Sequence, residues 1–431
     1  MNIAILGGGY TGLTAAYELQ KKGHTVSVYE KEKVLGGLAV GFKEKDWQWP
    51  LERAYHHLFE SDHEIIEFSK EIGFNKIFFT SSHTDSLYPD KNNNYRIIPV
   101  DSPLGFLRFP LLSMPDKLRA GFFIALFKYL PSLGIYERYT AEEFIRKFMG
   151  NQMWEVFMAE LFRKKFGEYA EKITTSFLWA RFHTRSKQLG YVSGGFQSFV
   201  EFLEALDLKN GVTIHKGTEI KNLKRKNNMF QIERSDYSNN QSIQEEYDAV
   251  ISTLPTPVLV KVGESIFPKE YSDKLKKIEY LHALVLIVQT KDPILEKTYW
   301  LNINDPQLPM MFVGQHTNFI DKKYYGGKHL AYIANYLPGD DSRLKLSDKE
   351  VLEYYQPYLE KIVNRKLKVE KSWIFKAPFA QPIWSKEYVN NRPSFTTPVE
   401  NFYVANLDMT YPFERGTNYA VKLGRQVSQL I

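Results

Sequence analysis

Hydrophobic residues make up 43 % and charged residues 25 % of the 431-residue sequence, values close to those of packed globular proteins. They exclude collagen-like, coiled-coil and disordered chains. The sequence has no cysteine, which excludes disulfides, thiolate metal sites and cysteine nucleophiles. Its 56 basic and 50 acidic residues give a net charge of +6, which is spread along the chain and supports only weak attraction to anionic ligands or surfaces.

No targeting or spanning segment is predicted. Residues 1–9 carry no cationic leader, so no signal peptide is expected. The most apolar stretch, residues 120–127, is far shorter than the roughly 20 residues that a membrane-spanning helix needs. Basic residues do not cluster and no nucleic-acid recognition motif is present. We therefore expect a cytoplasmic protein without a nucleic-acid partner.

The chain opens with a predicted strand, a tight turn and a helix. Residues 2–6 are apolar and lead directly into Gly7-x-Gly9-x-x-Gly12, after which apolar residues recur at helical spacing. A glycine ends this helix, and residues 25–30 form a second, β-branched strand. A βαβ unit of about 30 residues that contains such glycines is typical of nucleotide-binding folds.

In the middle of the chain, the sequence pattern changes from mixed α/β to helical and then back to mixed α/β. Residues 104–195 contain long aromatic and aliphatic segments at helical spacing, interrupted by prolines, and they predict a helical insertion. An amphipathic helix follows, and then strands at 212–214, 230–232 and 248–251. This pattern indicates that the α/β domain resumes after the insertion.

The last part of the chain predicts a second sheet. Strands at 283–289, 310–315 and 329–335 have no long helices between them, which favours an antiparallel sheet, and a helix near 348–363 follows. A final strand at 401–405 precedes a C-terminal helix. The predicted division places residues 1–90, 190–260 and 390–431 in a discontinuous α/β domain, and residues 91–189 and 261–389 in a second domain.

The glycines of the first turn and Glu30 suit a dinucleotide. Gly7 allows the turn, Gly9 lets a pyrophosphate approach the backbone, and Gly12 lets helix and strand pack closely, while the helix N-terminus attracts the phosphates. Glu30, at the end of the second strand, is placed to accept hydrogen bonds from ribose hydroxyls. A glycine-rich turn in a nucleotide-free sheet is the alternative.

Further features follow Glu30, namely Lys31 directly after it and the pair Gly36-Gly37. From here the sequence resembles the FAD-dependent amine oxidase superfamily, which includes protoporphyrinogen oxidases, phytoene desaturases and, more distantly, UDP-galactopyranose mutases. The resemblance implies noncovalent FAD, with Lys31, Gly36 and Gly37 at the cofactor. It also implies an α/β fold with a Rossmann-like FAD-binding domain of the GR2 type, assembled from discontinuous segments, and an α+β substrate domain with an antiparallel sheet and the helical insertion.

Two later segments extend the resemblance. Residues 190–196 resemble the Gly-x-x-x-Gly-Gly stretch that returns this superfamily's chain to its FAD domain. Residues 411–420 resemble the loop and helix start that close over the isoalloxazine ring. The usual Gly-Asp pair after the last strand is replaced by Asn406-Leu407-Asp408, so Asp408 is the candidate residue for the ribityl chain.

The expected helix start at Gly416, Thr417 and Asn418 has a physical reason. A reduced flavin carries negative charge near N1 and its C2 carbonyl, and the N–H groups of a helix N-terminus stabilise that charge. Gly416 permits close approach, and Thr417 or Asn418 can cap the helix. An ordinary capped helix is the alternative. Tyr411, as an aromatic wall, and Arg415, as a grip for an anionic substrate, are candidate catalytic residues.

A pair of histidines forms the other candidate constellation. Neighbouring residues on a strand point to opposite faces, so only one of His56 and His57 is expected to address a cleft. The pattern His57-Leu58-Phe59-x-x-Asp62 is similar to a mutase motif whose histidine lies close to the flavin. That similarity implies that His57 is a neutral hydrogen-bonding partner or proton shuttle. Packed or surface histidines remain the alternative, and no metal site is expected, because a third ligand is missing.

The resemblance implies an FAD-dependent oxidoreductase that transfers a hydride from a small organic substrate to flavin N5. A mutase-like isomerase acting on a nucleotide sugar is the second hypothesis, and a binding protein without turnover is the third. Residues 104–133 are expected either to cover the substrate cavity or to rest on a membrane surface. The sequence leaves the substrate, the electron acceptor and the oligomeric state open.

Overall fold

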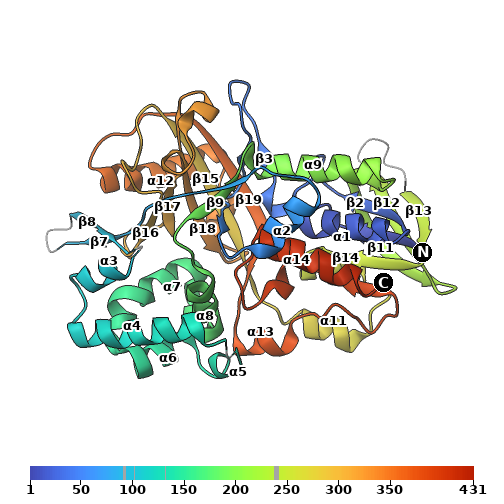
Figure 1. The fold of residues 1–431 in the computed structure, drawn as a ribbon, viewed down its shortest axis with the longest axis horizontal. Coiled ribbons are helices and arrows are strands. Elements are labelled where there is room, and N and C mark those ends of the chain that lie inside the picture. Colours follow the sequence, from blue (N-terminus) through green and yellow to red (C-terminus); the bar gives the residue numbers. More distant parts are fainter. Residues whose placement is uncertain (91–93, 101, 132, 237–241) are drawn as a thin grey trace.

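The computed structural model describes residues 1–90, 94–100, 102–131, 133–236 and 242–431. Figure 1 shows three regions: a parallel sheet near both chain ends, a larger sheet, and a group of helices between residues 103 and 184. The α/β fold expected from the sequence is therefore present.

The first region is a five-stranded parallel sheet in the order β10-β2-β1-β14-β20. Its strands are β1 (Asn2–Leu6), β2 (Thr25–Glu30), β10 (Thr213–Lys216), β14 (Ala249–Ser252) and β20 (Phe402–Val404). Helix α1 (Tyr10–Lys21) follows β1 and packs against α9 (Gly195–Lys209) and α14 (Thr417–Ser428). The sheet thus joins the beginning, the middle and the end of the chain.

The two faces of the parallel sheet are covered differently. Ile3 and Ile5 of β1 pack with residues of α1 and α14, whereas Ala4 and Leu6 pack against a three-stranded antiparallel sheet. That sheet consists of β11 (Thr218–Lys226), β12 (Met229–Asp236) and β13 (Ser242–Tyr247). Because side chains alternate along a strand, the continuous apolar run of β1 reflects burial on both faces.

The second region is a seven-stranded sheet in the order β19-β15-β18-β17-β16-β7-β8. Its strands are β7 (Thr84–Pro89), β8 (Tyr95–Pro99), β15 (Tyr280–Thr290), β16 (Trp300–Ile303), β17 (Phe312–Gln315), β18 (His329–Leu337) and β19 (Val369–Pro382). Helix α12 (Asp348–Val363) packs on one face through Val351, Tyr355 and Leu359. The strands predicted at 283–289, 310–315 and 329–335 correspond to β15, β17 and β18, and both of their pairings are antiparallel, as expected. The strands β16 and β7, which the sequence did not predict, run parallel to each other. The pairing of β7 with this sheet joins residues more than 200 positions apart, which no local pattern signals.

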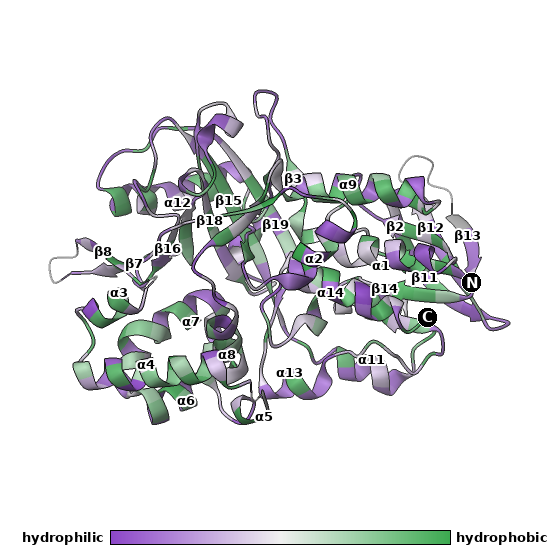
Figure 2. Cartoon of the chain, in the orientation of Figure 1, coloured by the Kyte–Doolittle hydropathy of each residue, from purple (hydrophilic) through white to green (hydrophobic). Residues whose placement is uncertain are grey.

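The helical insertion is present as α3 (Pro103–Arg108), α4 (Met114–Tyr129), α5 (Leu133–Tyr136), α6 (Ala141–Phe144), two π-helical turns (Ile145–Met149 and Met153–Met158), α7 (Ala159–Phe166) and α8 (Thr175–Thr184). Pro115 lies in the first turn of α4, where its missing N–H leaves no helical bond unmade, and Ser113 caps the helix. Figure 2 shows hydrophobic residues along most of α4. Such a helix has apolar side chains on its outward face as well as toward the core.

Shorter elements connect these regions. They are β3 (Gly41–Phe42), β4 (Leu51–Glu52), β5 (Leu58–Phe59), α2 (His63–Glu71), β6 (Ile77–Thr80), β9 (Leu189–Val192), α10 (Thr256–Val262), α11 (Lys269–Leu275) and α13 (Lys386–Asn391). The predicted strands and the C-terminal helix are confirmed within a few residues. The predicted boundary at residue 90 lies inside the β7–β8 hairpin. The division into domains stays a prediction.

Candidate active site

The turn between β1 and α1 is built on glycine. Gly7 has a φ of 112°, a left-handed conformation that side chains rarely adopt. A Cβ atom on Gly12 would overlap the carbonyl oxygen of Gly7. Gly12 therefore lets α1 start close against the end of β1, as expected from the motif.

The N-terminus of α1 is open. Its N-cap residue is Gly9, no side chain caps the helix, and no acidic residue lies in its first turn. The Gly36-Gly37 pair packs directly on this turn: Gly36 N donates to the carbonyl oxygen of Gly8 at 3.0 Å, and a Cβ on Gly37 would lie 3.3 Å from Gly9 Cα. The result is a glycine-lined cradle of backbone N–H groups at the positive end of a helix dipole, which fits a pyrophosphate.

Glu30 lies at the end of β2 and is buried. One carboxylate oxygen accepts from Gly8 N and the other from Glu32 N, both at 2.9 Å. Burial raises the pKa of Glu30, although the two backbone hydrogen bonds lower it in part. Because each carboxylate oxygen has a second lone pair, Glu30 can still accept from a hydroxyl while it holds the glycine turn. Lys31, the next residue, is exposed.

Asp408 lies in a 3₁₀ turn after β20 and is buried. Its Oδ2 accepts from the Thr256 hydroxyl and from Tyr280 Oη, the latter at 2.7 Å, whereas its buried Oδ1 has no hydrogen-bond partner among the described residues. Burial raises its pKa to about 6, against the lowering effect of these hydroxyls. The side chain thus points toward α10 and β15, and one carboxylate oxygen stays open as an acceptor.

The N-terminus of α14 is open as well. Gly416 is the N-cap residue, and no side chain caps the helix. The prediction that Thr417 or Asn418 caps it is wrong. Asn418 Oδ1 instead accepts from Ile65 N of α2 at 3.1 Å, and the Thr417 hydroxyl is buried without a partner in the part of the chain that the structure describes. Free N–H groups beside an unpartnered hydroxyl fit an acceptor-rich group such as the flavin C2 carbonyl.

Tyr411 lies in a different environment from the other predicted residues. Its ring contacts Trp384 and Tyr388, and the Arg392 guanidinium lies 5.0 Å from the ring centre. Its buried hydroxyl lies near the side chains of Thr174, Ser176 and Glu137. Burial raises its pKa to about 12. These contacts do not bring Tyr411 together with His57.

The two histidines have separate partners. His56 Nδ1 lies 2.8 Å from the carbonyl oxygen of Ala54, and His57 Nδ1 lies 3.3 Å from Tyr299 Oη. The expectation that both histidines lie on a strand is wrong, because β5 begins at Leu58. Burial lowers the pKa of each to about 4, so both are neutral at pH 7. Asp62, from the same motif, accepts from Phe59 N at 2.8 Å and closes the local turn.

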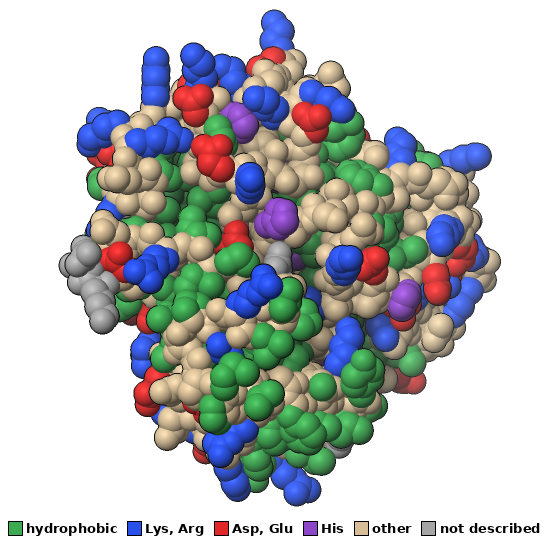
Figure 3. Space-filling view, turned by 60° about the vertical axis from the view of Figure 1, so that its left-hand side comes forward, with side chains coloured by type: hydrophobic (Ala, Val, Ile, Leu, Met, Phe, Trp, Pro, Cys, Tyr) green, Lys and Arg blue, Asp and Glu red, His purple; other side chains and the backbone are tan. Residues whose placement is uncertain are grey.

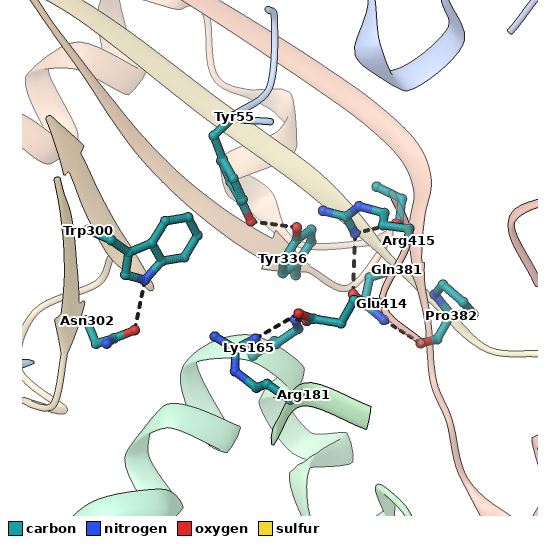
Figure 4. A network of polar contacts seen from close by, with 11 residues as sticks. Tyr55, Lys165, Arg181, Trp300, Asn302, Tyr336, Gln381, Pro382, Glu414 and Arg415 are labelled. Carbon is teal, nitrogen blue, oxygen red and sulfur yellow. Dashed lines mark hydrogen bonds and ion pairs between the residues drawn. The ribbon is translucent and has the colours of Figure 1, made fainter. Parts of the chain in front are cut away.

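A charged network joins the C-terminal loop to the helical insertion (Figure 4). Glu414 forms ion pairs with Lys165 of α7 and with Arg181 of α8, the second at 2.8 Å. Burial alone would raise the pKa of Glu414, but these two cations lower it to about 2. Burial lowers the pKa of Lys165 to about 8, although Glu414 counteracts the shift. The side chains stay partly exposed, with 31 % for Glu414 and 38 % for Arg181.

Arg415 lies beside this network. Its Nη1 donates to the carbonyl oxygen of Ala380 at 2.6 Å and to Gln381 Oε1 at 3.3 Å. Its guanidinium lies 4.6 Å from the ring centre of Tyr336, whose hydroxyl lies 2.7 Å from Tyr55 Oη. Figure 4 shows these groups facing a common space with Trp300, Lys165 and Arg181.

Sequence reasoning missed four of these residues, namely Tyr55, Lys165, Arg181 and Tyr336. The two partners of Glu414 are 249 and 233 positions away along the chain, so no spacing rule could connect them. In the described ranges, no group of three or more His, Asp or Glu side chains could hold a metal ion. No helix in those ranges is long and apolar enough to cross a membrane.

Comparison with known proteins gives one family. The model of the family described as flavin containing amine oxidoreductase matches residues 10–431. Coproporphyrinogen III oxidase of Staphylococcus aureus is 25 % identical over 310 residues, which are 60 % of this chain and 61 % of that protein. The match therefore spans less than two thirds of that relative's length.

Solved structures share the fold over the whole chain. A protein assigned as a protoporphyrinogen oxidase, from Exiguobacterium sp. 255-15, superposes with a TM-score of 0.75 and 17 % identity, and the match covers 100 % of this chain and 98 % of that one. Reduced UDP-galactopyranose mutase superposes with a TM-score of 0.73 and 15 % identity, covering 99 % of this chain and 94 % of that one. At such identities, the likeness shows the fold alone.

Proposed function

Because the chain belongs to the flavin-containing amine oxidoreductase family and its cofactor is FAD, we propose that it oxidises a C–H bond of a small organic substrate by hydride transfer to flavin N5. The bound cofactor supplies the redox chemistry, and the protein supplies binding, orientation and charge stabilisation. One observation carries the proposal: two open helix N-termini, those of α1 and α14, belong to helices that pack against each other on the same sheet.

The described residues suit separate parts of this task. The N–H groups at the start of α1 bind the pyrophosphate, and Glu30 accepts from the adenosine ribose. The N-terminus of α14 and the Thr417 hydroxyl hold the charge that develops on reduction. His57, neutral at pH 7, is a hydrogen-bonding partner at the substrate side.

We also assign cofactor binding and substrate binding to separate parts of the fold. In this proposal the parallel sheet with its three helices is the GR2-type FAD-binding domain, and the seven-stranded sheet with the helical insertion is the substrate domain. The ion pairs of Glu414 with α7 and α8 connect the loop before α14 to that insertion. The insertion thereby excludes water from the reacting groups.

An absorbance spectrum of the purified protein tests the proposal first. Bands near about 375 and 450 nm, and FAD identified by mass spectrometry after denaturation, are expected of a flavoprotein. Anaerobic mixing with amines, L-amino acids, porphyrinogens and polyenes then tests the reaction, because a substrate bleaches the 450 nm band. Colourless protein that takes up no FAD contradicts the proposal.

An isomerase of the mutase type is the second candidate, and one observation favours it. The His57 motif is similar to the mutase pattern. Incubating the dithionite-reduced protein with UDP-galactofuranose separates the candidates. Conversion of the sugar without consumption of an electron acceptor supports the isomerase alone, and no conversion contradicts it.

We also propose that the helical insertion rests on an anionic membrane surface. Ten of the fifteen large hydrophobic side chains that are exposed in the described ranges lie between residues 97 and 135, and Figure 3 shows hydrophobic side chains gathered over the lower part of one face. They are Ile97, Leu104, Leu107, Leu111, Met114, Leu118, Phe122, Tyr129, Leu130 and Ile135, here called the apolar surface. Residues 102–131 contain four basic side chains and one acidic side chain, which favours anionic lipid.

A further inference from the structure

Arg415 is a cation without an anionic partner. Its hydrogen bonds go to the neutral oxygens of Ala380 and Gln381, and, among the residues that the structure describes, no carboxylate forms an ion pair with it. The neighbouring Glu414 is already shared by Lys165 and Arg181. Three cations therefore face one carboxylate, and the Arg415 guanidinium is the one that this carboxylate does not neutralise.

The unpaired charge of Arg415 suggests that this residue binds an anionic ligand. A charge in a partly desolvated environment is unfavourable unless it is paired, and buried cations without partners are rare. Burial lowers the pKa of Arg415, because the loss of water disfavours the charged form of the guanidinium. Both hydrogen bonds use Nη1, so Nη2 and Nε stay free to donate. Two free N–H donors on a planar guanidinium match the two oxygens of a carboxylate.

The surroundings of Arg415 supply further recognition. The hydroxyls of Tyr55 and Tyr336 lie 2.7 Å apart, with the Tyr336 ring under the guanidinium. Tyr55 packs edge-on against Trp300 and Phe312, whose rings stack at 4.0 Å. The His57 ring packs edge-on against Trp300, with ring centres 6.1 Å apart. An anion subsite thus lies next to an aromatic wall that leads back to His57.

We propose that Arg415, together with the hydroxyls of Tyr55 and Tyr336, binds a carboxylate group of the substrate, and that Trp300 and Phe312 contact its apolar part. This inference rests on the proposed function and names the substrate class of that same site. The substrate is therefore an apolar or aromatic carboxylic acid. A substrate that carries only an amine or a hydrocarbon chain leaves Arg415 unpaired.

Binding of benzoate and of its neutral isostere benzamide to the FAD-loaded protein tests the inference. The two probes have the same ring and differ in charge, and the shift of the visible flavin band on titration reports binding of each. We expect the wild type to bind benzoate at least tenfold more tightly than benzamide. We expect Arg415→Gln to lower the benzoate affinity at least tenfold and to leave the benzamide affinity unchanged, with Arg415→Lys between the two.

Arg425→Gln is the matched control, because Arg425 lies on α14 and its cation is already paired with Glu18 and Glu71. This variant should bind benzoate like the wild type. If Arg415→Gln does not fold or does not retain FAD, Tyr336→Phe removes one hydroxyl only and should weaken benzoate binding several-fold without affecting benzamide.

Three results overturn the inference. The wild type could bind benzoate no better than benzamide, or the Arg415 variants could weaken both probes equally. Alternatively, Arg415→Gln could lower the flavin midpoint potential while the preference for benzoate persists, in which case the guanidinium serves the reduced cofactor. Each of these leaves the proposed function standing, since FAD is bound in all of them. Absence of FAD from the wild type would instead remove the proposed function itself.

Discussion

At the scale of single residues, Glu52 is a buried carboxyl on β4 that faces the start of α9. It accepts from Phe196 N at 2.7 Å and from Tyr191 Oη at 2.6 Å. Burial nevertheless raises its pKa to about 7 from an ordinary value of 4.5. An acid whose folded-state pKa is raised gives up its proton more readily in the unfolded chain. Its contribution to stability is therefore full below about pH 4.5 and falls as the pH rises to about 7.

We predict that Glu52→Gln removes this pH dependence. The difference in the free energy of unfolding between wild type and variant should change by up to about 3 kcal/mol in favour of glutamine between pH 4.5 and pH 7. Urea unfolding across this pH range measures it. Glutamine keeps an acceptor for Phe196 N, so the fold should persist. A difference that stays constant with pH contradicts the prediction.

The Thr417 hydroxyl provides a second residue-scale prediction. It is buried without a partner at the open N-terminus of α14. A polar atom that lacks a partner contributes nothing to stability until a ligand pairs with it. Thr417→Val should therefore leave the melting temperature of the FAD-free protein unchanged or slightly raised, and should weaken FAD binding about tenfold, or about 1.4 kcal/mol. Equal affinities of the two proteins, measured by flavin fluorescence, would show that the hydroxyl does not meet the cofactor.

At the scale of elements, two glycines in helices respond oppositely to the same change. A Cβ on Gly12 in α1 would overlap the Gly7 carbonyl oxygen, whereas Gly121 in α4 has nothing within 4 Å. Gly12→Ala should push α1 away from β1, abolish FAD binding and lower the melting temperature. Gly121→Ala should stabilise the protein by about 0.5–1 kcal/mol, because alanine loses less backbone entropy in a helix. Thermal unfolding and FAD titration of both variants measure the contrast.

Local features of the elements could be predicted from the sequence, whereas contacts between distant elements could not. The turn at Gly7 and the cradle formed with Gly36 could be predicted, because glycine spacing within forty residues encodes them locally. The environment of Asn418 could not, because its partner Ile65 N belongs to a helix 353 positions earlier. The site formed by Glu414 and Arg415 likewise depends on α7, α8 and β19, which meet only in the folded protein.

At the scale of the whole molecule, the apolar surface should determine where the protein resides. Leu118 and Phe122 lie on the outward face of α4 and are 63 % and 60 % exposed. We predict that the wild type sediments with vesicles of phosphatidylglycerol and phosphatidylcholine, that added salt weakens this binding, and that Leu118→Glu/Phe122→Glu abolishes it.

Leu208→Glu is the control for this experiment, because Leu208 is 50 % exposed on α9, far along the chain from the apolar surface. It should bind vesicles like the wild type, with unchanged FAD content in both variants. If the wild type ignores vesicles and the double variant instead turns a dimer into a monomer on sedimentation, the apolar surface is an interface between two copies of the chain.

The contact between α1 and α14 also has a consequence for biosynthesis. The glycine turn is synthesised long before α14, which begins only at Thr417, about 400 residues later. At about 5–20 residues per second, the nascent first strand waits roughly 20–80 s before its partner helix emerges. During that interval α1 can already cover Ile3 and Ile5 of β1, but the residues of α14 in the same cluster are still missing. The proposed cofactor site, which uses the N-termini of both helices, is therefore completed only after α14 has been synthesised.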